Sequence, residues 1–335
     1  MGANHYKYLK VKNFKRFDNL EVSDIGQFNL ILGDNNVGKT SLLEALLWNE
    51  QPQLFEGNLF EALKFRNVGE VDQFKVFQWY VNNNSIYDNK ASLQFIIRRD
   101  EDGERSFEYE LDFRFNSLLQ KLTVAQADSV EVGHALGNFS SRPIPFIPFS
   151  YGYSDDLVNL YSLKVQPDRE VKRDLISALR ALHPELDDIE ISISELTKKP
   201  GLICYFDKSS KPVPFPLLGE GVIKLFRVLV EIINNSGEII LIDELDTGIH
   251  YSRMTDYWKV ILQAALEYEV QVFASTHNRE CVESFQLAVQ DLGQVYQAKS
   301  RTVTLKQSPK TGNVKAYTAG FGVLKSAVEL GNELR

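Results

Sequence analysis

Cysteine is scarce in this chain. Its 335 residues include two cysteines, Cys204 and Cys281, which stand far apart and form no CxxC pair. This spacing excludes a disulfide framework and a cysteine-based zinc site, so we expect a reducing compartment, the cytoplasm. We expect each cysteine to be a small buried apolar residue.

Long hydrophobic runs and excess positive charge are also missing from the sequence. No apolar run approaches the roughly 18 residues that a membrane span needs, and the first residues lack the apolar core of a signal peptide. We therefore expect no membrane partner. The formal net charge of −8 argues against a broad basic surface for nucleic acid, although a local basic patch is compatible with it.

The sequence does contain a phosphate-binding loop, with the pattern G-x-x-x-x-G-K-T. It stands between an apolar run, Phe28–Leu32, which predicts a buried strand, and Ser41–Trp48, which predicts a helix. The residues predicted to bind nucleotide here are Gly33, Asp34, Asn35, Asn36, Val37, Gly38, Lys39, Thr40 and Ser41. The loop therefore predicts a site for a nucleoside triphosphate.

The residue types in this loop explain the expected chemistry. Gly33 and Gly38 let successive backbone N–H groups point inward at an anion, and the following helix adds its positive dipole end. Lys39 reaches the β and γ phosphates, and the Thr40 hydroxyl is suited to ligate Mg²⁺. Arg16, between two predicted strands upstream, either approaches the phosphates or is a solvated turn residue.

A second part of the site is predicted from an acidic strand end. Four apolar residues, Ile239–Ile242, predict a buried parallel strand, and Asp243 and Glu244 follow it directly. Ligands of such sheets sit beyond the carboxyl ends of the strands, which places both acids beside the phosphate loop. We expect Asp243 to hold Mg²⁺ and Glu244 to act as the general base for an attacking water.

Two further motifs accompany this strand. His277 follows another predicted strand, Gln271–Ala274, and therefore lies where it contacts a γ phosphate. Upstream, the turn Gly219, Glu220 and Gly221 opens a strongly predicted helix, Val222–Ile233, and forms a second anion site. Because the phosphate loop belongs to another strand, this turn is expected to serve a nucleotide bound by a different subunit.

The middle of the chain predicts an insertion. Ala91–Arg98 and Arg105–Phe115 read as strands of an antiparallel hairpin, and a proline-rich segment, 142–149, reads as an extended or edge segment. Helices are expected at 155–163 and 169–182. We therefore divide the chain into a core at 1–50 and 200–335 and an inserted arm at 51–199, with antiparallel β structure at 85–149 and helices at 150–199.

Together these motifs resemble an ATPase of the ABC superfamily, in the SMC/RecF/OLD-like branch, and more narrowly the bacterial AAA15/AAA21-type ATPases. The residues that carry the resemblance occur in the family order: Asn13–Phe17, Gly33–Leu46, Leu218–Gly221, Ile239–Ser252 and Gln271–Phe285. The resemblance implies an α/β P-loop NTPase fold, in which an ABC-ATPase head has a mixed or parallel central sheet plus an inserted antiparallel β and helical subdomain.

The resemblance also implies a mechanism. Two copies of the chain pack head to tail and sandwich two ATP molecules with Mg²⁺. Gly219, Glu220 and Gly221 of one head cap the γ phosphate held by Lys39 of the other, and residues 246–250 lie across the dimer seam. Glu244 activates water and His277 senses the γ phosphate. This chain departs from the family at Leu218-Gly219, where the usual signature has a serine.

Three functions follow from this resemblance. The first is an ATP-driven switch for a separately encoded effector, such as a nuclease or toxin, in phage defence or DNA maintenance. The second is a DNA-binding repair ATPase in the manner of RecF, against which the net acidity counts. The third is an AAA+ remodeller, against which the turn at 218–221 and the histidine after the next strand both argue.

Overall fold

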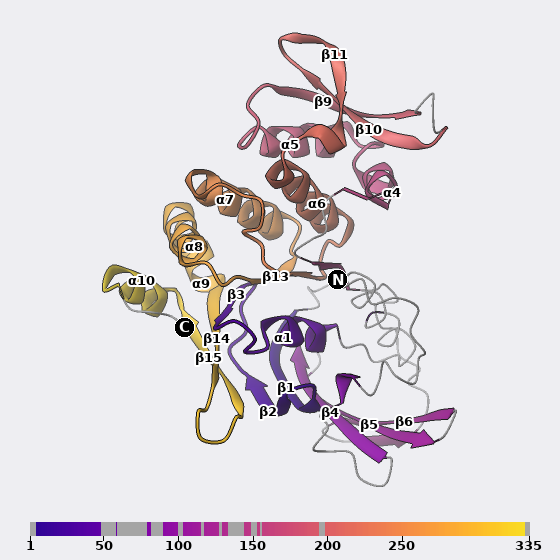
Figure 1. Ribbon diagram of the computed structural model, residues 1–335, viewed down its shortest axis with the longest axis vertical. Coiled ribbons are helices and arrows are strands. Elements are labelled where there is room, and N and C mark those ends of the chain that lie inside the picture. Colours follow the sequence, from indigo (N-terminus) through magenta and orange to yellow (C-terminus); the bar gives the residue numbers. More distant parts are fainter. Residues whose placement is uncertain are drawn as a thin grey trace.

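The computed structural model describes residues 5–47, 58, 79–81, 90–99, 103–114, 117–126, 129–132, 144–148, 153–154, 156–193 and 198–331. Its centre is a six-stranded sheet (Figure 1). In spatial order the strands are β15 (Val314–Gly320), β14 (Ser300–Gln307), β3 (Phe28–Gly33), β13 (Gln271–Ser275), β12 (Ile239–Ile242) and β8 (Phe146–Ile147). Every pairing is parallel except that of β14 with β15, so the sheet is mixed, as predicted.

The central sheet is buried on both faces. In β12, Ile240 and Ile242 join one hydrophobic cluster, whereas Ile239 and Leu241 join another, because side chains alternate along a strand. The first cluster includes buried residues of the helices α6 (Glu220–Asn234), α7 (Tyr251–Glu267) and α8 (Arg279–Leu292). The second contains α1 (Lys39–Leu46) and strand β1 (Tyr6–Phe14). Figure 1 shows these two layers above and below the sheet.

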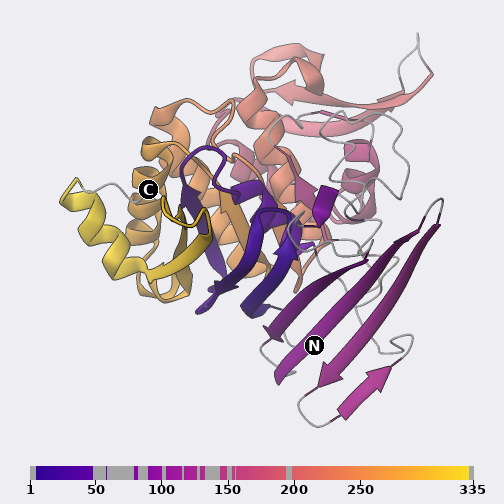
Figure 2. The same ribbon diagram turned by 60° about the horizontal axis from the view of Figure 1, so that its bottom comes forward.

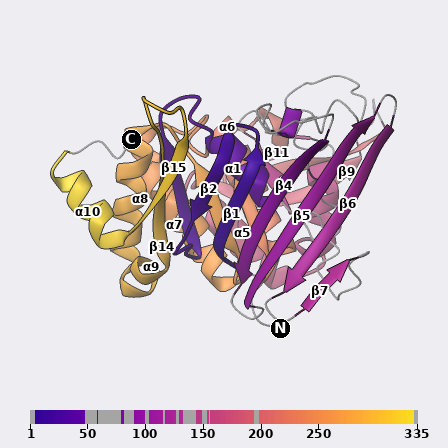
Figure 3. The ribbon, with the colours of Figure 1, turned by 90° about the horizontal axis from the view of Figure 1, so that it is seen from below.

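A second sheet lies beside α1 and is antiparallel throughout (Figures 2 and 3). Its order is β2 (Phe17–Val22), β1, β4 (Lys90–Arg99), β5 (Gly103–Arg114), β6 (Ser117–Gln126) and β7 (Ser129–Val132). Strand β4 pairs with β5 from Arg99 opposite Gly103, which confirms the predicted hairpin. Phe115, the last residue of the second predicted strand, lies outside the described residues.

A smaller layer packs against α6 on the side away from the central sheet (Figure 1). It contains α4 (Asp156–Lys164), α5 (Arg169–Leu179) and a three-stranded sheet of β9 (Leu186–Ile193), β10 (Pro200–Phe206) and β11 (Ser209–Pro214). A short turn of 3-10 helix, η2 (Phe215–Leu217), connects β11 to α6, and α9 (Gln294–Lys299) and α10 (Phe321–Glu329) complete the helices. Among the described residues, none of the helices has both the length and the hydropathy that a membrane span requires.

Strand pairing crosses the predicted boundaries between core and arm. Strand β1, from the core, pairs with β4, from the arm. Strand β8, placed in the arm, pairs with β12 at the edge of the central sheet, so the segment at 142–149 does contain the predicted edge strand. Strands β9 and β10 pair across residue 199. A sequence pattern indicates a strand but not its partner. The inserted arm at 51–199 therefore remains a prediction, and strands on both sides of its boundaries pair with each other.

Both cysteines are buried and form no disulfide, as predicted from their spacing. Burial raises the pKa of each thiol to about 12, which suits small apolar-like core residues rather than nucleophiles. Two other predicted ends lie outside the described residues: Trp48, at the end of the first predicted helix, and Asp155, at the start of a later one.

Candidate nucleotide-binding and hydrolysis site

The phosphate loop connects β3 to α1 through backbone conformations that favour glycine. Gly33 has φ 143° and Gly38, which precedes α1, has φ 114°. A Cβ on Gly33 would lie 2.7 Å from the Leu305 carbonyl oxygen, so no larger residue fits there. Lys39 Nζ donates to the carbonyl oxygens of Gly33 at 2.8 Å and Asp34 at 3.1 Å. The lysine therefore lies across the loop, where a phosphate binds in this motif.

The carboxyl ends of three parallel strands bring the predicted residues together. Strand β13 pairs with both β3 and β12, so their following loops meet at one edge of the sheet. Thr40 Oγ1 donates to Asp243 Oδ2 at 2.9 Å. Ser275 Oγ donates to the other oxygen, Asp243 Oδ1, at 2.6 Å. Asp243 is thus held in place by two hydroxyl groups, one from the start of α1 and one from the end of β13.

The Thr40–Asp243 pair fits the chemistry of Mg²⁺. Magnesium in phosphate-transfer sites is bound by one or two protein oxygens together with substrate phosphates and water. The hydroxyl of Thr40 and the carboxylate of Asp243 supply such hard oxygen ligands beside Lys39. No further protein ligand is needed at a site of this type, since the nucleotide itself completes the coordination.

Glu244 and His277 face each other at the same edge. His277 Nδ1 lies 3.3 Å from Glu244 Oε1, and both side chains are partly open to solvent. The Glu244 backbone N–H donates to Ser275 Oγ at 2.9 Å, so the same serine orients both acids of the strand end. Glu244 has φ 45°, a left-handed conformation that is uncommon for any residue other than glycine.

A cavity of about 490 Å³ lies over these groups. Its lining consists of Lys15, Arg16, Asn35, Asn36, Gly38, Lys39, Thr40, Ser41, Asp243, Glu244 and His277. The structure therefore collects most of the predicted loop residues, the two acids and the histidine around one space. Val37 is buried below the loop rather than lining the cavity. The volume is in the range of pockets that hold small molecules.

Two basic residues at the turn between β1 and β2 also line this cavity. Of the two readings of Arg16, the approach to the phosphate loop fits the structure, because a Cβ on Gly38 would meet Arg16 Cδ at 2.9 Å. Lys15 forms an ion pair with the fully buried Glu44 of α1, and its Nζ lies 4.3 Å from the centre of the Tyr80 ring. Sequence reasoning missed Lys15, although its position beside Arg16 was a usable signal.

Comparison with known proteins agrees with this geometry. The family model described as "AAA domain, putative AbiEii toxin, Type IV TA system" (AAA_21) matches residues 28–283, a span that contains the loop, both acids and the histidine. The chain belongs to the AAA_21 family. An "ATP/GTP phosphatase" of Helicobacter pylori is 22% identical over 344 residues, which cover 87% of this chain and 90% of that protein.

This AAA_21 protein also has a local sequence match, and solved structures show its fold. A "DNA replication and repair protein RecF" of Xanthomonas oryzae pv. oryzae is 31% identical over 70 residues, 21% of this chain and 19% of RecF. The crystal structure of an SMC head bound to the C-terminal winged-helix domain of ScpA superposes with a TM-score of 0.59 at 9% identity, covering 95% of this chain and 99% of that one. An SMC head bound to ScpA from Pyrococcus furiosus gives 0.58 at 9% identity, covering 97% and 99%. The chain is therefore a P-loop ATPase of the AAA_21 family, with the fold of an SMC head.

The predicted signature turn of this AAA_21 chain lies apart from its own cavity. None of Gly219, Glu220 and Gly221 is among the cavity-lining residues. Gly219 precedes α6, and Glu220 is exposed in the first helical turn. A Cβ on Gly221 would lie 3.1 Å from the Gly248 carbonyl oxygen, so the turn packs against the loop that follows Glu244. That this turn caps the γ phosphate bound by a second copy remains a prediction.

Helix α6 also carries a buried lysine that sequence reasoning missed. Lys224 is 4% exposed, and its Nζ donates to the Glu244 carbonyl oxygen at 2.5 Å. Burial lowers the pKa of Lys224 to about 8, and the charges of Asp246, Asp243 and Glu244 oppose that shift. The signal was available, because a lysine inside the apolar run 222–233 predicts a buried cation with a partner.

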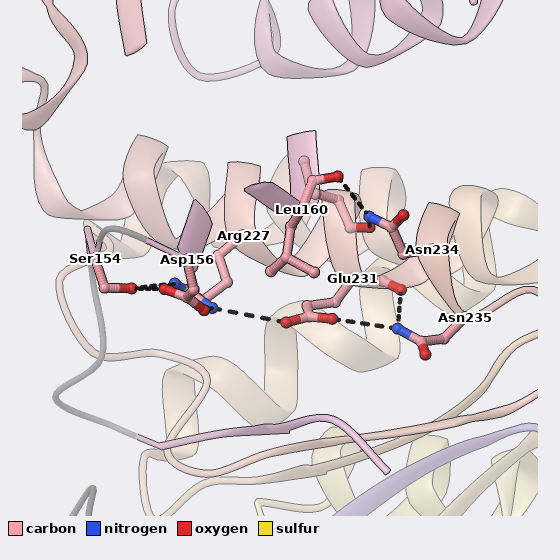
Figure 4. Close-up of polar contacts among 8 residues, drawn as sticks. Ser154, Asp156, Leu160, Arg227, Glu231, Asn234 and Asn235 are labelled. Carbon is pink, nitrogen blue, oxygen red and sulfur yellow. Dashed lines mark hydrogen bonds and ion pairs between the residues drawn. The ribbon is translucent and has the colours of Figure 1, made fainter. Parts of the chain in front are cut away.

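One turn further along α6, a second polar network connects this helix to α4 (Figure 4). Arg227, 2% exposed, donates from Nη1 and Nη2 to the two carboxylate oxygens of Asp156 at 3.2 and 3.0 Å. It also lies 3.6 Å from Glu231. Burial raises the pKa of Glu231 to about 7, although the positive charge of Arg227 opposes the shift. Asn235 Nδ2 donates to Glu231 at 3.2 Å and completes the network.

Proposed function

We propose that this chain is a head that binds and hydrolyses ATP, dimerises around ATP, and acts as a switch for a partner effector. The observation that supports the chemistry best is the connected set at one sheet edge. Thr40 donates to Asp243, Ser275 bonds both Asp243 and the Glu244 backbone, and His277 faces Glu244. This set joins the phosphate loop to the Glu244 carboxylate, which borders the cavity.

The residues take distinct roles in the proposed reaction. Lys39 and the loop N–H groups hold the phosphates, and Thr40 with Asp243 holds Mg²⁺, which neutralises phosphate charge when it is bound. Glu244 accepts a proton from the attacking water, since its carboxylate is partly solvent-exposed and borders the cavity. His277, which borders the cavity beside Glu244, is proposed to contact the γ phosphate.

The proposed dimer is supported by the exposure of the signature turn. The turn at 219–221 does not line the cavity of its own chain, so a second copy is needed to bring it to a phosphate. Two large apolar residues near it, Leu217 and Tyr251, are 73% and 62% exposed. A head-to-tail partner would cover both, which removes apolar surface from water.

The effector is proposed to be a separately encoded nuclease or toxin, in phage defence or DNA maintenance in the cytoplasm. The family description names a toxin–antitoxin system, and the similar SMC heads were solved with the separate protein ScpA. These names describe the relatives. For this chain, they support a head whose ATP binding and hydrolysis control a separate polypeptide.

Sizing of the Glu244→Gln variant tests the dimer. This variant keeps the loop and Asp243, so it should bind ATP, retain it, and shift from monomer to dimer when ATP and Mg²⁺ are added. Lys39→Ala should stay monomeric under the same conditions, because it loses the main phosphate contact. A Glu244→Gln protein that stays monomeric at saturating ATP would contradict the sandwich, and a stable closed ring would favour an AAA+ remodeller.

A second candidate function, DNA binding in the manner of RecF, is favoured by the 70-residue match to RecF. The test is the affinity for duplex DNA across a range of salt concentrations. A linear fall of log affinity with log salt, with a slope that reports several phosphate contacts, would support it. Absence of binding at low salt would exclude it, as the net charge of −8 leads us to expect.

A further inference from the structure

The buried ammonium of Lys224 lies between two loops of the proposed ATPase cycle. It stands three residues after Gly221, within one turn of the signature end of α6. Its Nζ donates to the main-chain oxygen of Glu244, the proposed general base, at 2.5 Å. Burying an ammonium group costs several kcal/mol unless strong partners offset it, so this contact holds a definite geometry.

The contact acts on a residue whose backbone is held in an unfavourable conformation. With φ 45°, Glu244 lies in the left-handed region, which is unfavourable for a residue with a side chain. Its N–H donates to Ser275 Oγ at 2.9 Å, and its carbonyl oxygen accepts from Lys224 and, at 3.2 Å, from the Thr247 N–H. Lys224 is therefore one of the groups that stabilise the conformation placing the Glu244 carboxylate at the cavity.

The start of α6 touches the same loop at a second point. Gly221 packs against the Gly248 carbonyl, and a Cβ on Gly248 would lie 2.9 Å from Glu220 Cβ. Residues 244 and 248 belong to the same loop, 243–250, so α6 contacts this loop at two points. A displacement of the signature turn is then transmitted to the Glu244 backbone through rigid helix and direct contacts.

We propose that Lys224 is a positioning residue that sets the backbone of Glu244 and couples it to the signature turn of the same chain. In the ATP-bound dimer, the signature turn of one chain meets the nucleotide of its partner. Lys224 then makes the hydrolysis step in one cavity depend on whether the other cavity is occupied. This inference rests on the proposed function, because it needs a second copy to bring nucleotide to the signature turn.

The test is the ATPase kinetics of Lys224→Met, which is unbranched like lysine and one atom shorter, and which removes the charge and the donor. Lys224 does not line the cavity, so the affinity for ATP should stay within about twofold of wild type. The kcat should fall about 10- to 100-fold, because the base loses its position. Wild type should show an ATP dependence steeper than hyperbolic, and Lys224→Met a hyperbolic one.

Lys164→Met is a matched control. Lys164 of α4 also donates to main-chain oxygens, those of Ile233 and Asn234 at the other end of α6, at 3.4 and 3.1 Å. The substitution removes an ammonium-to-carbonyl contact with α6 that does not involve Glu244. The kcat and the cooperativity should therefore stay at wild-type values. If Lys224→Met fails to fold, Lys224→Gln, shorter and neutral, carries the same expectations.

The inference is overturned if a folded Lys224 variant keeps wild-type kcat and cooperativity, or if it loses ATP affinity in parallel with kcat. Failure of the proposed function gives a different result. In that case the wild-type protein does not hydrolyse ATP, or Glu244→Gln does not dimerise with ATP, whatever stands at position 224.

Discussion

Helix α6 contains two buried cations three residues apart, and they contact opposite parts of the protein. Lys224 donates to a single main-chain oxygen at the edge of the nucleotide cavity, close to three acidic side chains. Arg227 makes a two-point contact with Asp156 and approaches Glu231, away from the cavity (Figure 4). The planar guanidinium suits a bidentate carboxylate, and the compact ammonium suits one carbonyl oxygen.

The comparison teaches that burial of charge has two different uses on one helix. The Arg227 network joins α6 to α4 and contains no residue of the cavity lining, so its loss should lower the stability of the folded protein. The Lys224 contact acts on Glu244, so its loss should lower the rate of ATP hydrolysis. The following predictions separate these two effects, from the largest to the smallest.

The largest effect is expected at Glu244 itself. Replacing this residue by glutamine keeps its size and removes the proton acceptor, so kcat should fall about 100- to 10,000-fold. The unfolding midpoint should not change, since the side chain is partly exposed. Phosphate release and a thermal melt measure the two quantities, with Glu267→Gln on the surface of α7 as the control. A wild-type rate in Glu244→Gln would refute its assignment as the base.

Arg227→Met should produce the converse result. Removing one partner of a buried ion pair costs about 3–5 kcal/mol, and because Asp156 is 47% exposed we expect about 3 kcal/mol of lost stability. The kcat of the folded fraction should stay within about threefold of wild type. Chemical denaturation and single-temperature kinetics test this. A large loss of kcat with little loss of stability would place Arg227 in the catalytic apparatus instead.

Glu231 gives the Arg227 network a pH dependence. Burial raises its folded-state pKa from 4.5 to about 7, so the folded protein retains a proton that the unfolded chain releases. Its contribution to stability is therefore complete below about pH 4.5 and is lost as the pH rises through about 7.

The Glu231→Gln variant should lack this dependence. Relative to this variant, wild type should lose about 2 kcal/mol of stability between about pH 5 and about pH 8. Urea unfolding of both proteins at the two pH values measures the difference. A difference that stays constant, or that changes with the opposite sign, would show that Glu231 remains ionised in the folded protein.

His277→Ala should have the smallest effect. The histidine is 46% exposed, so water replaces part of its contact with Glu244. We expect kcat to fall about tenfold, equivalent to about 1.4 kcal/mol, with unchanged stability and ATP affinity. Phosphate release at saturating ATP is the measurement. If the loss exceeded that of Glu244→Gln, the histidine would be the stronger candidate for the base.

Much of the site was predictable because its motifs are local. Gly33 and Gly38 have the positive φ values that the loop motif requires, and β3 and α1 flank them as predicted. Asp243 and His277 each follow a short apolar strand, and parallel strands end at a common edge. The apolar runs therefore predicted which acids and which histidine meet, without knowledge of the exact strand order.

Other contacts were not predictable, because they depend on which segments become neighbours. The role of Ser275 as a partner of both Asp243 and Glu244 needs β12 and β13 to be adjacent. The pairing of β1 with β4 joins segments that the sequence assigned to different subdomains. Strand partners are selected by the whole sheet, so a pattern of apolar residues along one strand does not identify them.

The sequence by itself determined the class of chemistry, because the phosphate loop, the acidic strand end and the histidine have local signatures at short range. The tertiary structure alone decided how these parts are held together. Thr40 and Asp243 meet across 203 residues, Ser275 and Asp243 across 32, and Lys224 and Glu244 across 20. Contacts at such separations arise only when the sheet and α6 pack, which is why the position of Glu244 depends on the fold.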